Sequence, residues 1–174
     1  GTISPRVCDA LERDDPAVEP LLKEMLKRSE GVRGFFVQYL TDPSLSKPDQ
    51  AEPPAALRAA MGEAPRPMLA ELMVMNVIMP VATSMVHQRN GDAEMAESAR
   101  LTAKRATALV SNVPMDEVRH DLIAVLAVCE SEPAPTGVSE ERMAFWHTFC
   151  DRWQYDEMQR TMIATVIHAL IDDA

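Results

Sequence analysis

The sequence predicts an all-α protein, a single domain over residues 1–174 built as a bundle of about six to eight helices. Apolar residues recur at intervals of three and four along most of the chain, and no stretch alternates as a half-buried strand does. The segment over 66–89 is apolar nearly all round and rich in methionine. A helix without a polar face is buried on all sides, so we place this segment at the centre of the bundle.

The first forty residues predict an acidic arm followed by one long helix. Residues 1–15 are polar and contain several carboxylates, so we interpret them as an arm. Asp15 is a good N-cap and Pro16 a good first-turn residue, so we expect the helix to begin there. The spacing of apolar residues carries this helix to Leu40, where a loop rich in Pro and Ser follows over 41–54.

The middle of the chain predicts three helices separated by Pro, Gly and Asn signals. A pair of prolines opens a short helix over 55–61, and Gly62 ends it. The central helix over 66–89 ends at the Asn-Gly pair that follows it. Asp92 then caps a helix over 93–110.

The last third of the chain predicts three further helices. A helix over 115–130 precedes a second Pro-bearing loop over 131–138. The serine that ends this loop region caps a helix over 140–153. Asp156 and Gln159 have the spacing of a capping box, so they begin a last helix that runs almost to the C-terminus.

Composition limits the classes of partner. A formal charge of −10 and a pI of about 4.8 argue against nucleic acid and against an anionic membrane surface, because both are negatively charged. The three cysteines are widely spaced, so we predict no disulfide framework, no metal motif and a reducing compartment. The longest apolar run is shorter than the ~18 residues of a membrane span, so we expect no transmembrane helix.

Asn76 and Pro80 are the anomaly of the central helix. Pro80 has no N–H, so the carbonyl of Asn76 loses its helical donor at the level of a polar amide. We interpret the pair as a structural kink whose polar groups are satisfied by water or a neighbour. The alternative is a polar pocket that holds an apolar molecule against Met73, Met79, Met85 and the aromatic segment described below.

Two short patterns could carry enzyme chemistry. Glu117 and His120 have the i, i+3 spacing of a metal-binding helix, but no second such motif occurs, so a surface pair is the simpler interpretation. Cys150 follows His147 by three residues among aromatic neighbours, and we interpret it as a buried, inert thiol. With no Gly-rich phosphate loop or nucleophile elbow present, we predict no catalytic, metal-binding or cofactor-binding residue.

A basic cluster and an aromatic segment are the candidate docking features. We expect the cations around the 93–110 helix to form a solvated helix face, with a docking patch for an acidic partner as the alternative. The segment over 145–155 holds both tryptophans, and we interpret it as a core stripe, with a partner anchor as the alternative. The candidate docking residues are Arg89, Arg100, Lys104, Arg105, Trp146, Trp153 and Tyr155.

Two segments, MNVIMPVATSMV in the central helix and FWHTFCDRWQYDEMQ near the C-terminus, carry a family resemblance. They resemble segments of small all-helical accessory proteins of plastid and cyanobacterial photosynthetic complexes, among them peripheral stroma-side subunits and assembly factors of photosystems. The resemblance extends over about residues 66–172. It implies a non-enzymatic subunit in the plastid stroma, peripheral to a thylakoid membrane complex, with no catalytic residues.

The residues themselves favour the same class of function without naming a complex. Our first hypothesis is an accessory or assembly subunit that binds a protein partner. The second is a helical domain that binds an apolar molecule near Asn76. The third is a metal-dependent helical enzyme that uses Glu117 and His120.

Overall fold

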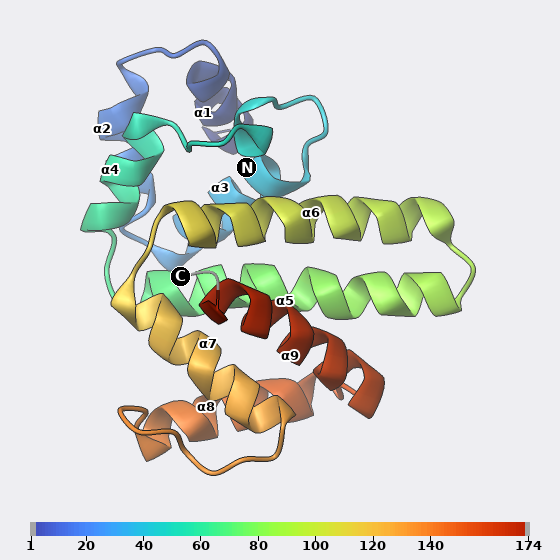
Figure 1. Cartoon of the computed structure of the whole chain (residues 1–174). Coiled ribbons are helices and arrows are strands. Elements are labelled where there is room, and N and C mark those ends of the chain that lie inside the picture. The colour runs from blue at the N-terminus through green and yellow to red at the C-terminus, as the bar shows by residue number, and fades with distance from the viewer. Residues whose placement is uncertain (1–2, 173–174) are drawn as a thin grey trace.

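The computed structural model describes residues 3–172, and within them it contains nine α-helices, one short 3-10 helix and no strand. The all-α prediction is confirmed. The helices are arranged in three tiers: an N-terminal group of four, a central hairpin of two and a C-terminal group of three (Figure 1). Residues 1–2, the start of the predicted arm, and residues 173–174 lie outside the described part of the chain.

The N-terminal tier begins with a helix where the sequence indicated an arm. Val7, Cys8 and Leu11 are buried on one face of this helix, and the face packs mainly against the third helix of the tier. A narrow apolar face is sufficient to hold this helix, because the other helices of the tier cover only one side of the helix. The four helices are α1 (Ile3–Glu12), α2 (Val18–Met25), α3 (Ser29–Thr41) and α4 (Ala55–Glu63).

The single helix predicted up to Leu40 is in fact two helices, α2 and α3, because the chain turns between Leu26 and Arg28. Gly31, in the first turn of α3, lies directly against the end of α2. A Cβ atom at this position would overlap the backbone carbonyl of Met25. A residue without a side chain therefore lets α3 start close behind α2. The predicted loop over 41–54 is confirmed and contains the 3-10 helix η1 (Lys47–Asp49).

The central tier is an antiparallel hairpin of α5 (Met68–Arg89) and α6 (Ala93–Asn112), and it lies between the other two tiers (Figure 1). The side chain of Asp92 accepts a hydrogen bond from the Met95 N–H at 3.1 Å, so the predicted cap is confirmed. α5 continues as a helix through Pro80.

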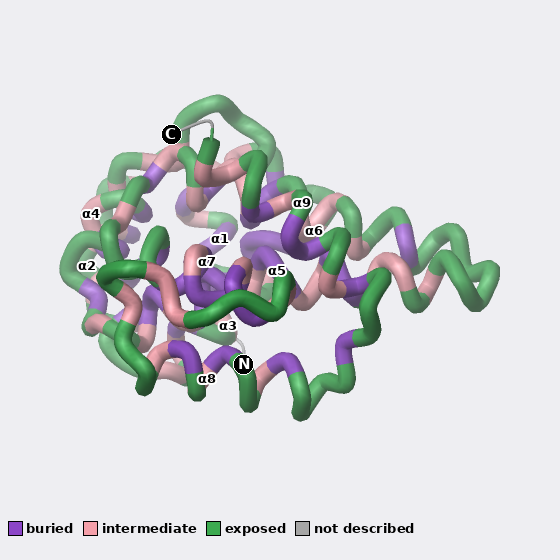
Figure 2. Tube along the Cα trace, turned by 60° about the horizontal axis from the view of Figure 1, so that its bottom comes forward, coloured by how far each residue is buried: buried purple, intermediate pink, exposed green. Residues whose placement is uncertain are grey.

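Burial along α5 is uneven. Its first two-thirds is largely buried, whereas Thr83 and Val86 are exposed and the tip of the hairpin carries mostly exposed residues (Figure 2). The prediction of burial on all sides is therefore correct for the part that other helices cover and wrong beyond it. The buried residues of α5 are Leu69, Ala70, Leu72, Met73, Val74, Val77, Ile78, Val81 and Ala82.

α5 is also long and apolar enough to cross a membrane, with a mean hydropathy of 1.7 over its most apolar window. Half of that window is buried inside the protein, and the core helix of a globular protein passes the same test of length and composition. The absence of a membrane span stays a prediction.

The C-terminal tier packs against the hairpin through its first and last helices. The predicted N-caps are confirmed: Ser139 Oγ accepts from the Arg142 N–H at 3.2 Å. Asp156 and Gln159 exchange two hydrogen bonds, at 2.8 and 2.9 Å, as a capping box does. The helices are α7 (Asp116–Cys129), α8 (Glu140–Arg152) and α9 (Glu157–Asp172).

An ion cluster ties this tier to the hairpin, and no sequence pattern indicated it. The guanidinium of Arg142 donates to both carboxylate oxygens of Asp121, at 3.0 and 2.9 Å, and to Glu71 at 2.8 Å. Its centre also lies 4.8 Å from the centroid of the Phe145 ring. Because α5, α7 and α8 each contribute a charged group, the cluster fixes the relative positions of three helices.

Replacing Gly31 with alanine is expected to lower the free energy of unfolding by about 1–3 kcal/mol, because the added methyl group would push α3 away from α2. Gly62, near the end of α4, is the matched control. No atom lies within 4 Å of a Cβ placed there, so Gly62→Ala is expected to be neutral or to stabilise by up to about 1 kcal/mol. Denaturant unfolding measures both variants, and equal stabilities would contradict the close approach at Gly31.

Candidate functional site

A groove runs between α6 and α9, with α5 as its floor. Both helices pack on α5, but they hardly contact each other. The groove has a volume of about 530 Å³ and is open to solvent. Val81 contributes to the floor; Ala103, Thr107 and Ala108 of α6 line one side, and Val166 and Ala169 of α9 line the other.

Small side chains explain why the groove is open. Most side chains that face the groove, such as Ala103 and Thr107 of α6 and Ala169 of α9, are too short to meet across α5. The α9 wall continues beyond the groove itself, because Met158 and Met162 precede Val166 at helical spacing and share its face. Met158 is 64% exposed and Met162 is 44% exposed. The wall is therefore an apolar stripe along most of α9.

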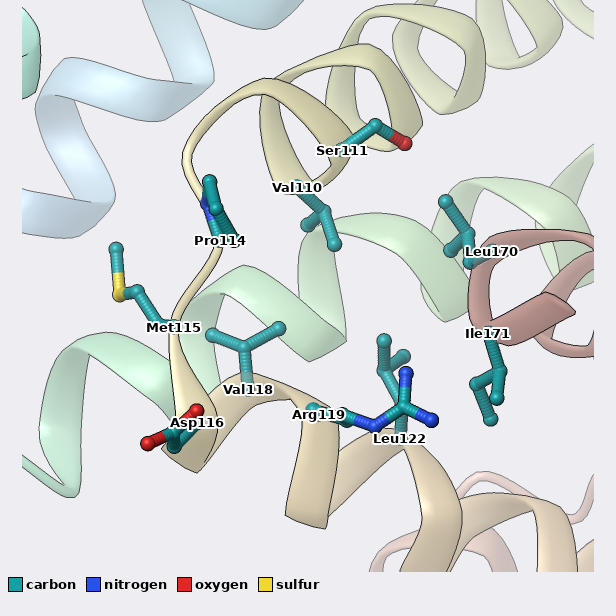
Figure 3. Close-up of a pocket in the computed structure, with 10 residues that line it drawn as sticks. All are labelled: Val110, Ser111, Pro114, Met115, Asp116, Val118, Arg119, Leu122, Leu170 and Ile171. Carbon is teal, nitrogen blue, oxygen red and sulfur yellow. The ribbon is translucent and has the colours of Figure 1, made fainter. Parts of the chain in front are cut away.

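A smaller pocket continues the groove at the C-terminal end of α9. The two share Ser111 and Leu170, and the pocket has a volume of about 190 Å³. Figure 3 shows Val118, Leu122 and Leu170 pointing into a common space, with the guanidinium of Arg119 at its edge. The apolar surface thus extends from α9 across to α7.

Cations border this surface. Lys104 lines the groove, Arg100 lies one turn earlier on the same face of α6, and Arg119 lies at the far pocket. Arg100 donates to Glu97 at 2.9 Å and to Gln88 at 3.1 Å. Within residues 3–172, the side chains of Lys104 and Arg119 form no ion pair. Of the predicted docking cations, Lys104 therefore lines the groove, and Arg100 lies one turn before it on α6.

Arg89 lies elsewhere, at the end of α5. Its guanidinium donates to both carboxylate oxygens of Asp156, at 2.7 and 3.3 Å, and links α5 to the start of α9. This hydrogen-bonded pair lowers the pKa of the Asp156 carboxyl. Both side chains are exposed, so the pair is a surface link between helices.

Arg105 does not belong to a surface patch, contrary to the sequence-based hypothesis. It is 2% exposed, and its guanidinium donates to both carboxylate oxygens of Asp49 at 2.9 Å. It also donates to the backbone carbonyls of Asp42 at 2.7 Å and Leu45 at 3.0 Å. The charge pair with Arg105 lowers the pKa of Asp49. Arg105 therefore fixes the loop between α3 and α4 onto α6.

The aromatic segment is mostly core, as the sequence favoured. Trp146 is fully buried and forms T-shaped pairs with Phe145 and Phe149, at ring-centroid distances of 4.9 and 5.4 Å. Tyr155 is also buried, and burial raises the pKa of its phenol. Neither can anchor a partner, which corrects two of the predicted docking residues. Trp153 is 51% exposed and remains on the surface.

The central-helix anomaly lines neither the groove nor the pocket of Figure 3, nor two further pockets of the described residues. Asn76 and Pro80 are half-buried. The linings of these four pockets, all within residues 3–172, do not include Asn76, Met73, Met79 or Met85. None of these four pockets therefore supports the ligand hypothesis at this site.

The two patterns that could carry enzyme chemistry are not completed by further catalytic or metal-binding side chains within residues 3–172. Glu117 and His120 are exposed on α7, and no group of three or more His, Cys, Asp or Glu side chains converges within residues 3–172. Cys150 is buried as predicted, and His147 is exposed.

A family model described as "Uncharacterised conserved protein UCP020893" matches residues 6–170 of the chain. No curated protein and no solved structure matches the chain significantly. The match covers all three tiers, so it concerns the whole fold and not one helix or hairpin. The photosynthetic resemblance stays a prediction.

Substitution of Arg105 by methionine is expected to destabilise the fold by about 2–4 kcal/mol, because Asp49 and two loop carbonyls would lose their donor. Arg100→Met on the same helix is the matched control and is expected to cost less than about 1 kcal/mol, since its pair with Glu97 is exposed. Denaturant unfolding measures both. A loss of similar size in the two variants would contradict the structural role of Arg105.

Proposed function

The chain belongs to this uncharacterised conserved family, and we propose that it is a non-enzymatic interaction protein that binds a helix of a protein partner in the groove between α6 and α9. The observation that supports the proposal is an apolar groove with a basic border on a molecule of charge −10. Monomeric proteins seldom leave an extended apolar surface open to water unless something binds there.

The shape of the groove favours a helix as its occupant. It lies along α9, and its wall from Met158 to Ala169 is about 16 Å long at a rise of about 1.5 Å per residue. A partner helix of about three turns matches this length. Anchors at i, i+3, i+4 and i+7 would fill the space that Ala103 and Ala108 leave open. The flexible methionines on the wall adapt to such side chains.

The charges favour an acidic partner helix. Lys104 and Arg119 lie at opposite parts of the apolar surface, and Arg100 lies one turn from Lys104. Carboxylates flanking the apolar face of a partner helix would meet these cations at the border of the groove. Such border charges mainly raise the association rate and fix the orientation of the helix.

The more specific form of the proposal is a stroma-side accessory or assembly subunit of a photosystem. It is supported by the resemblance of the MNVIMPVATSMV and FWHTFCDRWQYDEMQ segments alone. A groove with a basic border for an acidic partner would also suit a protein that binds at the edge of a membrane complex.

A small apolar ligand in the pocket of Figure 3 is the alternative. Val118, Leu122 and Leu170 give the pocket an apolar lining. Its volume of about 190 Å³ is below the ~300–1,000 Å³ that is usual for ligand sites. We therefore favour the partner helix, which would cover both the pocket and the groove.

The test is native separation of extracts from source cells in which the chain is replaced by tagged variants. The wild-type protein is expected to migrate with a large assembly. Met162→Glu on the wall and Lys104→Glu on the border are each expected to reduce the assembled fraction about tenfold, a loss of ~1.4 kcal/mol. For Lys104→Glu, the loss is expected to shrink at high salt.

Thr161→Glu is the matched control, because Thr161 is exposed on α9 but points away from the groove. It is expected to assemble like the wild type. A free monomer in the source extract, or equal assembly of all variants, would overturn the proposal. If instead only a second copy of the chain is bound, the groove would be a self-association surface.

A further inference from the structure

The pocket of Figure 3 is lined by side chains from three helices that meet beside the groove. Val110 comes from α6, Val118 and Leu122 come from α7, and Leu170 comes from the end of α9. In Figure 3 these four apolar side chains surround a common space. The pocket therefore has an apolar interior that its own lining leaves open.

The size of the pocket matches a single aromatic ring. Its volume is about 190 Å³. An apolar cavity of ~150 Å³ is large enough to bind one benzene molecule. The pocket is thus smaller than a usual ligand site but large enough for one aromatic side chain.

The rim of the pocket favours an aromatic side chain over an aliphatic one. Met115 lies on one side, and a thioether sulfur makes favourable contacts with aromatic rings. The guanidinium of Arg119 lies at the edge, where it can contact the face of a ring. The Met115 sulfur accepts a hydrogen bond from the Arg66 guanidinium at 3.2 Å, which holds this side of the rim in place.

The charges on the rim give the occupant an orientation. Asp116 lies beside Met115, whereas the Arg119 side chain extends toward Ile171 (Figure 3). Asp116 and Arg119 are both exposed. A carboxylate close to the bound ring would therefore be attracted to the Ile171 side of the rim by Arg119 and repelled from the other side by Asp116.

We propose that this pocket holds an aromatic side chain of the partner helix, and that a carboxylate close to that ring pairs with Arg119. The inference rests on the proposed function, since the partner helix must lie in the groove. The groove and the pocket share Ser111 and Leu170, so a helix along α9 also reaches the pocket. Aromatic side chains that fill a pocket are typical hot spots of protein interfaces. The partner is then selected by an aromatic anchor with an acidic neighbour.

The first test uses two small probes on the full chain. 3-Phenylpropionate carries a ring and a carboxylate, and 3-phenylpropan-1-ol carries the same ring without the charge. NMR titration with phenylpropionate is expected to shift the methyl signals of Val110, Val118 and Leu122, with a dissociation constant of roughly 1 mM. The alcohol is expected to bind at the same place about threefold more weakly, because it lacks the exposed ion pair. No saturable binding of either probe, or shifts only outside the pocket, would overturn the proposal.

Arg119→Glu tests the charge on the rim. It is expected to weaken phenylpropionate binding about tenfold and binding of the alcohol less than about threefold. Arg152→Glu makes the same change in net charge and is the matched control, because Arg152 is exposed on α8 and lines neither the pocket nor the groove. It is expected to bind both probes like the wild type. An equal loss in the two variants would overturn the pairing with Arg119.

Val110→Phe tests the interior by filling it. Val110 is half-buried and does not line the groove. The variant is expected to abolish binding of both probes and to reduce the assembled fraction in source extracts about tenfold. Met162→Glu on the α9 wall is expected to reduce assembly but to keep probe binding. If Val110→Phe fails to fold, Arg119→Glu and the wild-type titration still decide the question.

The outcomes separate this inference from the proposed function. Assembly of the wild type that Val110→Phe leaves unchanged would overturn the aromatic anchor and keep the groove as the binding site. Probe binding by a wild-type protein that migrates as a free monomer would overturn the proposed function, and the anchor with it, since no partner helix would then supply the ring.

Discussion

The need to cover α5 is the constraint on which the rest of the structure depends. This helix has almost no polar face over its first two-thirds, and each large side chain buried there contributes about 1.5–3 kcal/mol. α6 covers it along its whole length, α3 covers it from the N-terminal tier, and α7 and α9 cover it from the C-terminal tier. Where only α6 covers α5, exposed residues begin, and the tip of the hairpin extends into solvent.

Local signals predicted most of the fold, and long-range pairings were missed. Caps at Asp92, Ser139 and Asp156 lie within a few residues of the N–H groups they bind, so they are visible in the sequence. The break before α3 depends on the contact of Gly31 with the preceding helix. The formation of α1 depends on the helices against which its narrow apolar face packs. Neither is a property of one segment. For these two reasons, the nine α-helices within residues 3–172 exceed the predicted number.

The sequence predicted part of the candidate site: it indicated the cations near the groove but not the groove itself. Lys104 lines the groove and Arg100 lies one turn before it, but Arg105, adjacent to Lys104 in sequence, donates to the carboxylate of Asp49 instead. A one-residue step on a helix rotates a side chain by about 100°, so adjacent cations meet different neighbours. The groove forms because small side chains such as Ala103 on α6 leave a gap to α9. A short side chain leaves such a gap only where the neighbouring helix does not come close. Periodicity does not reveal such gaps between helices.

The burial of Trp146 gives the protein an optical property of its own. Its indole N–H is the one buried side-chain nitrogen or oxygen that lacks a hydrogen-bond partner over residues 3–172, and its ring is fully enclosed. Trp153, the other tryptophan, is half exposed. The two indoles therefore report separately: Trp146 emits from a dry environment at short wavelength, and Trp153 emits from a wet one within reach of a dissolved quencher. Loosening of the C-terminal tier would shift the first signal to longer wavelength before any helix is lost.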